Sequence, residues 1–144
     1  MKYLLDTCVL SELVKKKPDQ RVVKWIASIE ESKLFISVLT IGEIHKGIEK
    51  MPKSKRREML LQWVDEDLQE RFRGRTIPFD LQAAAVWGKM QAKAEMSGKT
   101  IPIIDGMIAA TAITHNFAVA TRNISDMEAS KAVLVNPWDE DVFV

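Results

Sequence analysis

The sequence predicts an α/β fold, a three-layer α/β/α sandwich around a central, mainly parallel sheet. Short apolar segments alternate with helical patterns along the whole chain, as in parallel sheets covered by helices on both faces. A length of 144 residues is enough to bury a real core, and it favours a single domain over 1–144. A composition of 47% hydrophobic and 28% charged residues is ordinary for a soluble globular protein.

The first half of the chain should contribute two strands and four helices. The segments 2–6 and 34–38 are short and apolar, and they are expected to be buried strands. The helices predicted around them each carry apolar residues at helical spacing, and they span 7–16, 19–30, 40–50 and 54–71.

The second half should add three strands and two helices. A short strand at 76–79 precedes a long helix that starts after Asp80, a plausible N-cap, and stops at Gly98. We expect this helix to pack through a narrow face of Leu81, Ala84, Ala85, Gly88, Ala92 and Met96. The helix at 105–114 is apolar almost all round and should be central. The last two strands are expected at 117–121 and, on an edge, at 132–136.

Several classes of protein are disfavoured by composition. The apolar runs are shorter than the roughly 18 to 20 residues of a membrane helix, and the N-terminus lacks a signal-peptide layout. A single cysteine excludes an internal disulfide framework and suits the cytoplasm. The formal charge of +1 gives no global attraction to nucleic acid, so such binding must come from local patches.

Four acidic residues should meet at one edge of the predicted sheet. Asp6 ends the first strand, Glu43 follows the second, Asp105 heads the apolar helix, and Asp126 follows strand 117–121. In parallel α/β folds the ligand crevice lies beyond the carboxyl ends of the strands. Carboxylates that converge there repel one another unless they are protonated or bind a divalent cation. Oxygen ligands favour Mg²⁺ or Mn²⁺, whereas two histidines and one cysteine make zinc less suitable.

Each acid also has a purely structural interpretation. Asp6 could cap the helix that follows it. Glu43 completes a T-x-x-E capping box with Thr40. Asp105 could be an ordinary residue at a helix N-terminus, where the helix dipole stabilises its negative charge. Asp126 could be a solvated turn residue.

The order and spacing of these blocks resemble PIN-domain ribonucleases, specifically the VapC/FitB-like toxins of bacterial toxin–antitoxin pairs. The matching blocks are LLDTCVLSEL (4–13), ISVLTIGEIHKGI (36–48), IPIIDGMIAATA (101–112) and ATRNISDME (120–128). The resemblance implies that the four acids form a metal-binding catalytic quartet, supported by Thr7, Thr121 and Asn123. Cys8 departs from the pattern, because the family commonly has Asn there.

The resemblance implies a Mg²⁺-dependent (or Mn²⁺-dependent) endoribonuclease that cleaves RNA through a metal-activated water. It also implies a homodimer and a hetero-oligomer with an antitoxin whose C-terminal segment enters the active-site groove. Two other functions stay open. One is a catalytically inactive PIN-fold module that binds a partner protein. The other is an α/β phosphatase with Asp6 as nucleophile, although that chemistry usually needs a second acid where this chain has Cys8.

Basic residues near the predicted site are candidates for RNA binding. Arg122, beside Asn123, is one phosphate contact, and the helix-start cluster of Lys53, Lys55, Arg56 and Arg57 is another. Solvated helix ends explain the cluster equally well. The four tryptophans are expected in the core or in a dimer interface, and Cys8 is expected as a small packed residue.

Overall fold

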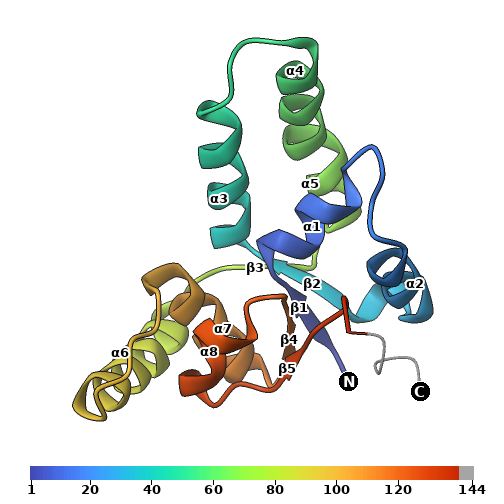
Figure 1. The fold of residues 1–144 in the computed structure, drawn as a ribbon. Coiled ribbons are helices and arrows are strands. Elements are labelled where there is room, and N and C mark those ends of the chain that lie inside the picture. Colours follow the sequence, from blue (N-terminus) through green and yellow to red (C-terminus); the bar gives the residue numbers. More distant parts are fainter. Residues whose placement is uncertain (140–144) are drawn as a thin grey trace.

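The computed structural model describes residues 1–139, and its centre is a sheet of five parallel strands (Figure 1). The strand order is β3-β2-β1-β4-β5, so β1 is central. The last strand, β5, lies at an edge, as predicted. All four neighbouring pairs run parallel. The strands are β1 (Tyr3–Leu5), β2 (Leu34–Ser37), β3 (Thr76–Ile77), β4 (Ala118–Ala120) and β5 (Leu134–Val135).

Helices cover both faces of this sheet and confirm the predicted α/β class. The longer ones are α1 (Thr7–Leu13), α2 (Gln20–Ser28), α3 (Val38–Glu49), α4 (Lys55–Gln62), α6 (Leu81–Met96) and α7 (Ile103–His115). The shorter ones are η1 (Glu31–Lys33), α5 (Leu68–Arg71), α8 (Ile124–Met127) and η3 (Glu128–Ser130).

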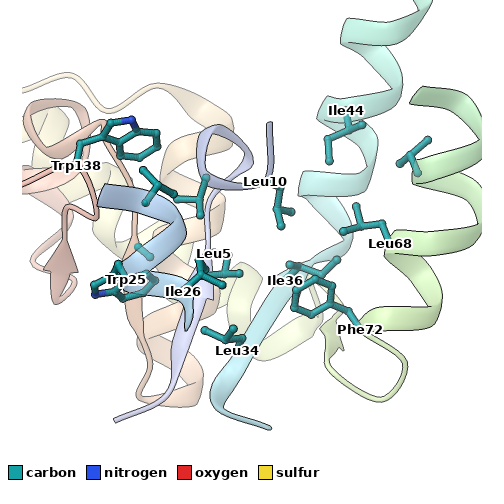
Figure 2. Packing of buried hydrophobic residues seen from close by; sticks show 14 of the residues in the cluster. Leu5, Leu10, Trp25, Ile26, Leu34, Ile36, Ile44, Leu68, Phe72 and Trp138 are labelled. Carbon is teal, nitrogen blue, oxygen red and sulfur yellow. The ribbon is translucent and has the colours of Figure 1, made fainter. Parts of the chain in front are cut away.

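Successive residues of each strand point to opposite faces and so divide the core into layers. Leu5 of β1 belongs to the cluster under α1 to α5, whereas its neighbour Leu4 packs with Ile108 of α7. Figure 2 shows the first cluster, in which Phe72 and Leu68 reach Ile36 of β2. A third cluster joins α6 to the outer side of α7. Strands buried on both faces explain why the strand segments are apolar throughout.

Several predicted helices differ in extent from those observed; the one expected at 7–16, for example, ends at Leu13. The helix predicted at 40–50 begins at Val38, because Ser37 is its N-cap and accepts a hydrogen bond from the Leu39 N–H at 3.0 Å. The helix predicted at 105–114 begins at Ile103. The predicted helix 54–71 contains a π-helical turn, η2 (Trp63–Asp67), between α4 and α5.

The packing face predicted for α6 is wrong. Leu81 and Met96 are 88% and 81% exposed. The buried residues of α6 are Ala83, Met90 and Ala94, of which the last two belong to the cluster with α7. Its predicted ends are confirmed: Asp80 caps it by accepting from the Ala83 N–H at 3.0 Å, and Gly98 follows it with a φ of +71°. No helix within residues 1–139 has both the length and the apolar character needed to cross a bilayer.

Candidate active site

Asp6 lies where the central strand ends and α1 begins. Its backbone N–H donates to the carbonyl of Ala120 at 2.9 Å, so the chain is fixed to β4 at this point. Oδ1 accepts from the Thr7 N–H at 2.8 Å, which makes Asp6 the N-cap of α1. Oδ2 accepts from the Thr121 hydroxyl at 2.7 Å. The capping role is therefore real but involves only one carboxylate oxygen.

Burial raises the pKa of the Asp6 carboxyl, and hydrogen bonds from Thr121, Thr7 and Cys8 oppose that rise. The residue is only 2% exposed. A carboxylate in this position is costly unless hydrogen bonds or a cation compensate its charge. The donors from α1 and from the segment after β4 provide part of that compensation.

Thr121, which follows β4, connects Asp6 to the next turn. Its hydroxyl donates a hydrogen bond to Asp6 and accepts one from the Asn123 N–H at 2.9 Å. The buried hydroxyl therefore acts both as a donor and as an acceptor. Asn123 precedes α8, and its side chain forms no capping hydrogen bond to that helix. Thr121 therefore contacts Asp6 directly, while Asn123 reaches this network through its backbone.

Cys8 takes part in the same network, a contact that sequence reasoning missed. Its Sγ lies 3.7 Å from Asp6 Oδ2, 3.7 Å from Thr121 Oγ1 and 3.4 Å from the backbone N of Arg122. Burial, followed by the nearby charge of Asp6, raises the pKa of this thiol to about 11. Cys8 therefore stays protonated and can donate to the carboxylate, and it does not act as a thiolate nucleophile.

Glu43 projects from α3 toward α1. Its Oε1 accepts a hydrogen bond from the Thr7 hydroxyl at 2.6 Å, and the same threonine donates its backbone N–H to Asp6. Thr7 therefore bridges two acids of the quartet. The alternative capping box does not form: Ser37 caps α3, and the buried Thr40 hydroxyl has no hydrogen-bond partner within residues 1–139.

Asp105 lies in the first turn of α7 and is half-buried. Burial first, and then the charges of Asp6, Glu43 and Asp126, raise the pKa of its carboxyl to about 6. The field of the other three acids at Asp105 means that all four occupy one region. Asp126 lies in α8 and is exposed.

These acids form a loose arrangement rather than a tight cluster. Within residues 1–139, no three His, Cys, Asp or Glu side chains come together closely enough to form a metal-binding group. A donor set made only of carboxylate oxygens suits Mg²⁺ or Mn²⁺, because Mg²⁺ keeps several waters and needs only one or two protein carboxylates. The residues present therefore fit a hard divalent cation.

The basic candidates have different surroundings. The guanidinium of Arg122 lies 5.2 Å from the ring centroid of Trp138 and is exposed. Arg56 and Arg57 donate to the carbonyls of Val14 and Ile48, at 2.9 and 3.2 Å. Lys53 and Lys55 are exposed near the start of α4 and are the less constrained members of that cluster.

A parallel sheet with this acidic edge defines a class of protein, and comparison with known families identifies it. Residues 3–127 match the family model described as the PIN domain. The chain belongs to the PIN-domain family, as the resemblance in its motifs predicted.

Within this family the chain is similar to VapC and FitB proteins along nearly its whole length. It is 40% identical to the VapC ribonuclease Y4jK of Sinorhizobium fredii over 136 residues, which cover 94% of this chain and 97% of that protein. It is 34% identical to Toxin FitB of Neisseria gonorrhoeae over 137 residues, which cover 95% and 99%. The crystal structure of FitAcB from Neisseria gonorrhoeae superposes with a TM-score of 0.89 at 34% identity, covering 94% of this chain and 98% of that one.

Proposed function

We propose that this protein is a Mg²⁺- or Mn²⁺-dependent endoribonuclease and the toxin of a toxin–antitoxin pair, acting in the cytoplasm as one PIN-like domain over residues 1–144. The observation that carries the proposal is the link from Asp6 through Thr7 to Glu43 at the carboxyl end of β1, with Asp105 near enough that, beyond burial, the charges of both raise the pKa of its carboxyl. Similarity to a VapC ribonuclease and to Toxin FitB over more than nine-tenths of the chain supports the same activity.

Asp6, Glu43 and Asp105 would hold the cation, and Asp126 would be a further ligand or would orient water. When bound, the cation activates water and neutralises charge at the phosphodiester. The protein orients the carboxylates: Thr121 and Cys8 hold Asp6 from one side, and Thr7 links Asp6 to Glu43. We assign phosphate binding to Arg122, whose guanidinium is held over Trp138, with Lys53, Lys55, Arg56 and Arg57 as further contacts.

An antitoxin is the partner that this surface suits. A groove of about 360 Å³ runs between α1, α3 and α4 and includes Thr7 and Glu43. Part of the groove therefore lies at Glu43, and apolar side chains such as Ile44, Ile48 and Leu60 line it together with Arg56. We propose that an antitoxin segment occupies this groove and that a cationic side chain from it binds the acids. The complexes FitAcB and FitAB bound to an IR36 DNA fragment, both 34% identical in the matched chain, support such a partner.

The decisive experiment measures RNA cleavage by the purified, partner-free protein with and without Mg²⁺ or Mn²⁺. We expect Asp6→Asn and Asp105→Asn each to lower cleavage by about 100-fold or more, because each removes charge from the cation site. Growth arrest on expression should be relieved in parallel. Asp67→Asn, a carboxylate on the exposed side of the π-helical turn, is the matched control and should stay active.

Folding of every variant is checked by circular dichroism. A folded wild-type protein without cation-dependent cleavage would favour the inactive binding module. Full activity in both folded site variants would show that the acids are not catalytic.

A further inference from the structure

A second groove, of about 620 Å³, lies away from the acidic residues. It is formed by the C-terminal half of α6, the end of α7 and η3. Asp105 lies in the first turn of α7. Ile113, which lines the groove, is eight residues further on, or about 12 Å along the helix axis. The groove is also separate from the one between α1, α3 and α4.

The floor of this groove is apolar. It is formed by Val86, Met90, Ala94, Ile113 and Ala129. The apolar surface continues onto Met96, which is 81% exposed at the end of α6. Flexible methionine side chains adapt well to the apolar side chains of a partner, so they are common at protein-binding surfaces.

The rim of the groove is strongly basic. Lys89 and Lys93 are one turn apart on α6, Lys99 follows that helix, and Lys131 follows η3. None of the residues lining the groove is acidic. Among residues 1–139, no ion pair involves any of these four lysines. The groove therefore combines an apolar floor with four lysine side chains that form no ion pair within the described residues.

We propose that this groove binds an amphipathic helix of a partner protein, with aliphatic side chains on the floor and Asp or Glu side chains facing the lysines. Charge complementarity selects an acidic partner, and the floor selects aliphatic residues at helical spacing. The phosphates of a nucleic acid would match the rim but leave the floor unfilled. A small anionic ligand would leave the exposed apolar surface at Met96 uncovered. The proposal goes beyond nuclease activity and does not depend on it.

The test uses the full chain and a synthetic helical peptide of about four turns, with Leu at i, i+3, i+4 and i+7 and Glu on the flanking positions. Binding is followed by NMR of isotopically labelled methionine methyl groups. Met90 and Met96 report on this groove, Met51 reports on the groove at the acidic residues, and the exposed Met59 is a reference.

We expect saturable shifts at Met90 and Met96 alone. The double variant Lys89→Glu/Lys93→Glu should weaken binding by about tenfold or more, because it replaces attraction by repulsion. The double variant Lys16→Glu/Lys24→Glu makes the same charge change on exposed lysines outside the groove and should bind as the wild type does. A peptide with Lys in place of Glu should not bind.

Four results would overturn the proposal. The first is the absence of a saturable shift up to about 1 mM peptide, because a dissociation constant above that value means that binding is very weak. The second is a shift centred on Met51. The third is tighter binding of dodecanoate or a short RNA than of the peptide at Met90 and Met96. The fourth is a shift of these two methyl groups on simple dilution, which would mean that a second copy of the chain fills the groove.

Discussion

At the scale of single residues, Thr121 determines how the Asp6 carboxylate is held. Its buried hydroxyl forms the shortest side-chain hydrogen bond to Asp6, and it also accepts a hydrogen bond from the Asn123 N–H. Thr121→Val keeps the shape of the side chain but removes both hydrogen bonds, so that only the weak Cys8 donor remains at Asp6 Oδ2. We expect a loss of about 1–3 kcal/mol in the free energy of unfolding and a tenfold or larger loss of cleavage.

Urea unfolding and RNA cleavage measure these two effects. The matched control is Thr111→Val, because Thr111 is equally buried but donates only within α7, to the Met107 carbonyl at 2.8 Å. This control should keep full activity. Equal activity losses in the two variants would contradict a specific role for Thr121.

The Asp105 carboxyl makes stability depend on pH. Its pKa is about 6 in the folded protein, because of burial and the neighbouring acids, against an ordinary 3.8. Between about pH 4 and 6 the folded state holds a proton that the unfolded state has lost, so this contribution to stability declines as pH rises through the window. Asp105→Asn should flatten that slope. It should also stabilise the cation-free protein near pH 7.5 by about 1 kcal/mol, a value reduced for solvent screening.

Thermal unfolding at several pH values measures the slope in wild type and variant. Added Mg²⁺ should reverse their order near pH 7.5, because the cation stabilises the carboxylate that the variant lacks. Parallel pH profiles for the two proteins would mean that Asp105 does not repel its neighbours.

The sequence predicted that these four acids lie near one another better than it predicted their individual contacts. Strand ends and family spacing identify Asp6, Glu43, Asp105 and Asp126, because the carboxyl ends of parallel strands share an edge. The link from Thr7 to Glu43 depends on how α1 packs against α3, which no local pattern encodes. One feature of the sequence could have indicated the contact between Cys8 and Asp6: the two residues are only two positions apart at the start of a helix. A single cysteine is, however, more often a packed core residue.

At the scale of elements, the contact between α6 and α7 depends on Gly106. A Cβ at this position would lie 2.9 Å from Gln91 Oε1 and 3.3 Å from Trp87 Nε1. Gln91 cannot move freely, because its Nε2 donates to the Ile101 carbonyl at 3.0 Å. We expect Gly106→Ala to lower stability by about 1–3 kcal/mol through overpacking and to displace the neighbouring Asp105.

Gly88→Ala is the matched substitution on α6. Nothing lies within 4 Å of a Cβ at this exposed position, so the higher helix propensity of alanine should stabilise the protein by about 1 kcal/mol. Chemical unfolding compares the two variants. Stabilisation by both substitutions would mean that α6 can move away from Gly106 without loss of stability, which would contradict the close contact between α6 and α7.

The same pair of helices shows where sequence patterns mislead. Leu81 and Met96 suggested a packing face for α6, yet the true face contains the polar Gln91 and the indole of Trp87 between Ala83 and Ala94. A helix rich in alanine gives little hydrophobic contrast between its faces, so the choice of face is made by tertiary packing. By contrast, Asp80 and Gly98 predicted its ends correctly, because caps act locally.

At the scale of the whole molecule, exposed apolar residues begin three helices at the acidic edge. They are Val38 of α3, Leu81 of α6, and Ile103 and Ile104 of α7. Large apolar side chains gathered at the starts of helices suit an interface between two copies of the chain. The homodimer expected from the family resemblance would use this edge.

We therefore expect Leu81→Asp/Ile103→Asp to convert a dimer into a monomer in sedimentation experiments. The free energy of unfolding of the monomer should change by less than about 0.5 kcal/mol, because both side chains are exposed. Met59→Asp, at an exposed position on α4, should remain dimeric. A wild-type protein that sediments as a monomer at all concentrations would contradict the expected dimer.

The hydrogen bond between Thr121 and Asp6 joins positions 115 residues apart in the chain. During synthesis Asp6 leaves the ribosome long before Thr121, the residue that orients it. In the same way, β1 can pair with β4 only after β4 has been synthesised. A nascent or prematurely terminated polypeptide that ends before β4 cannot form this hydrogen bond, which holds one carboxylate of the proposed catalytic site. The order of the strands thus delays formation of this site until β4 and Thr121 have been synthesised.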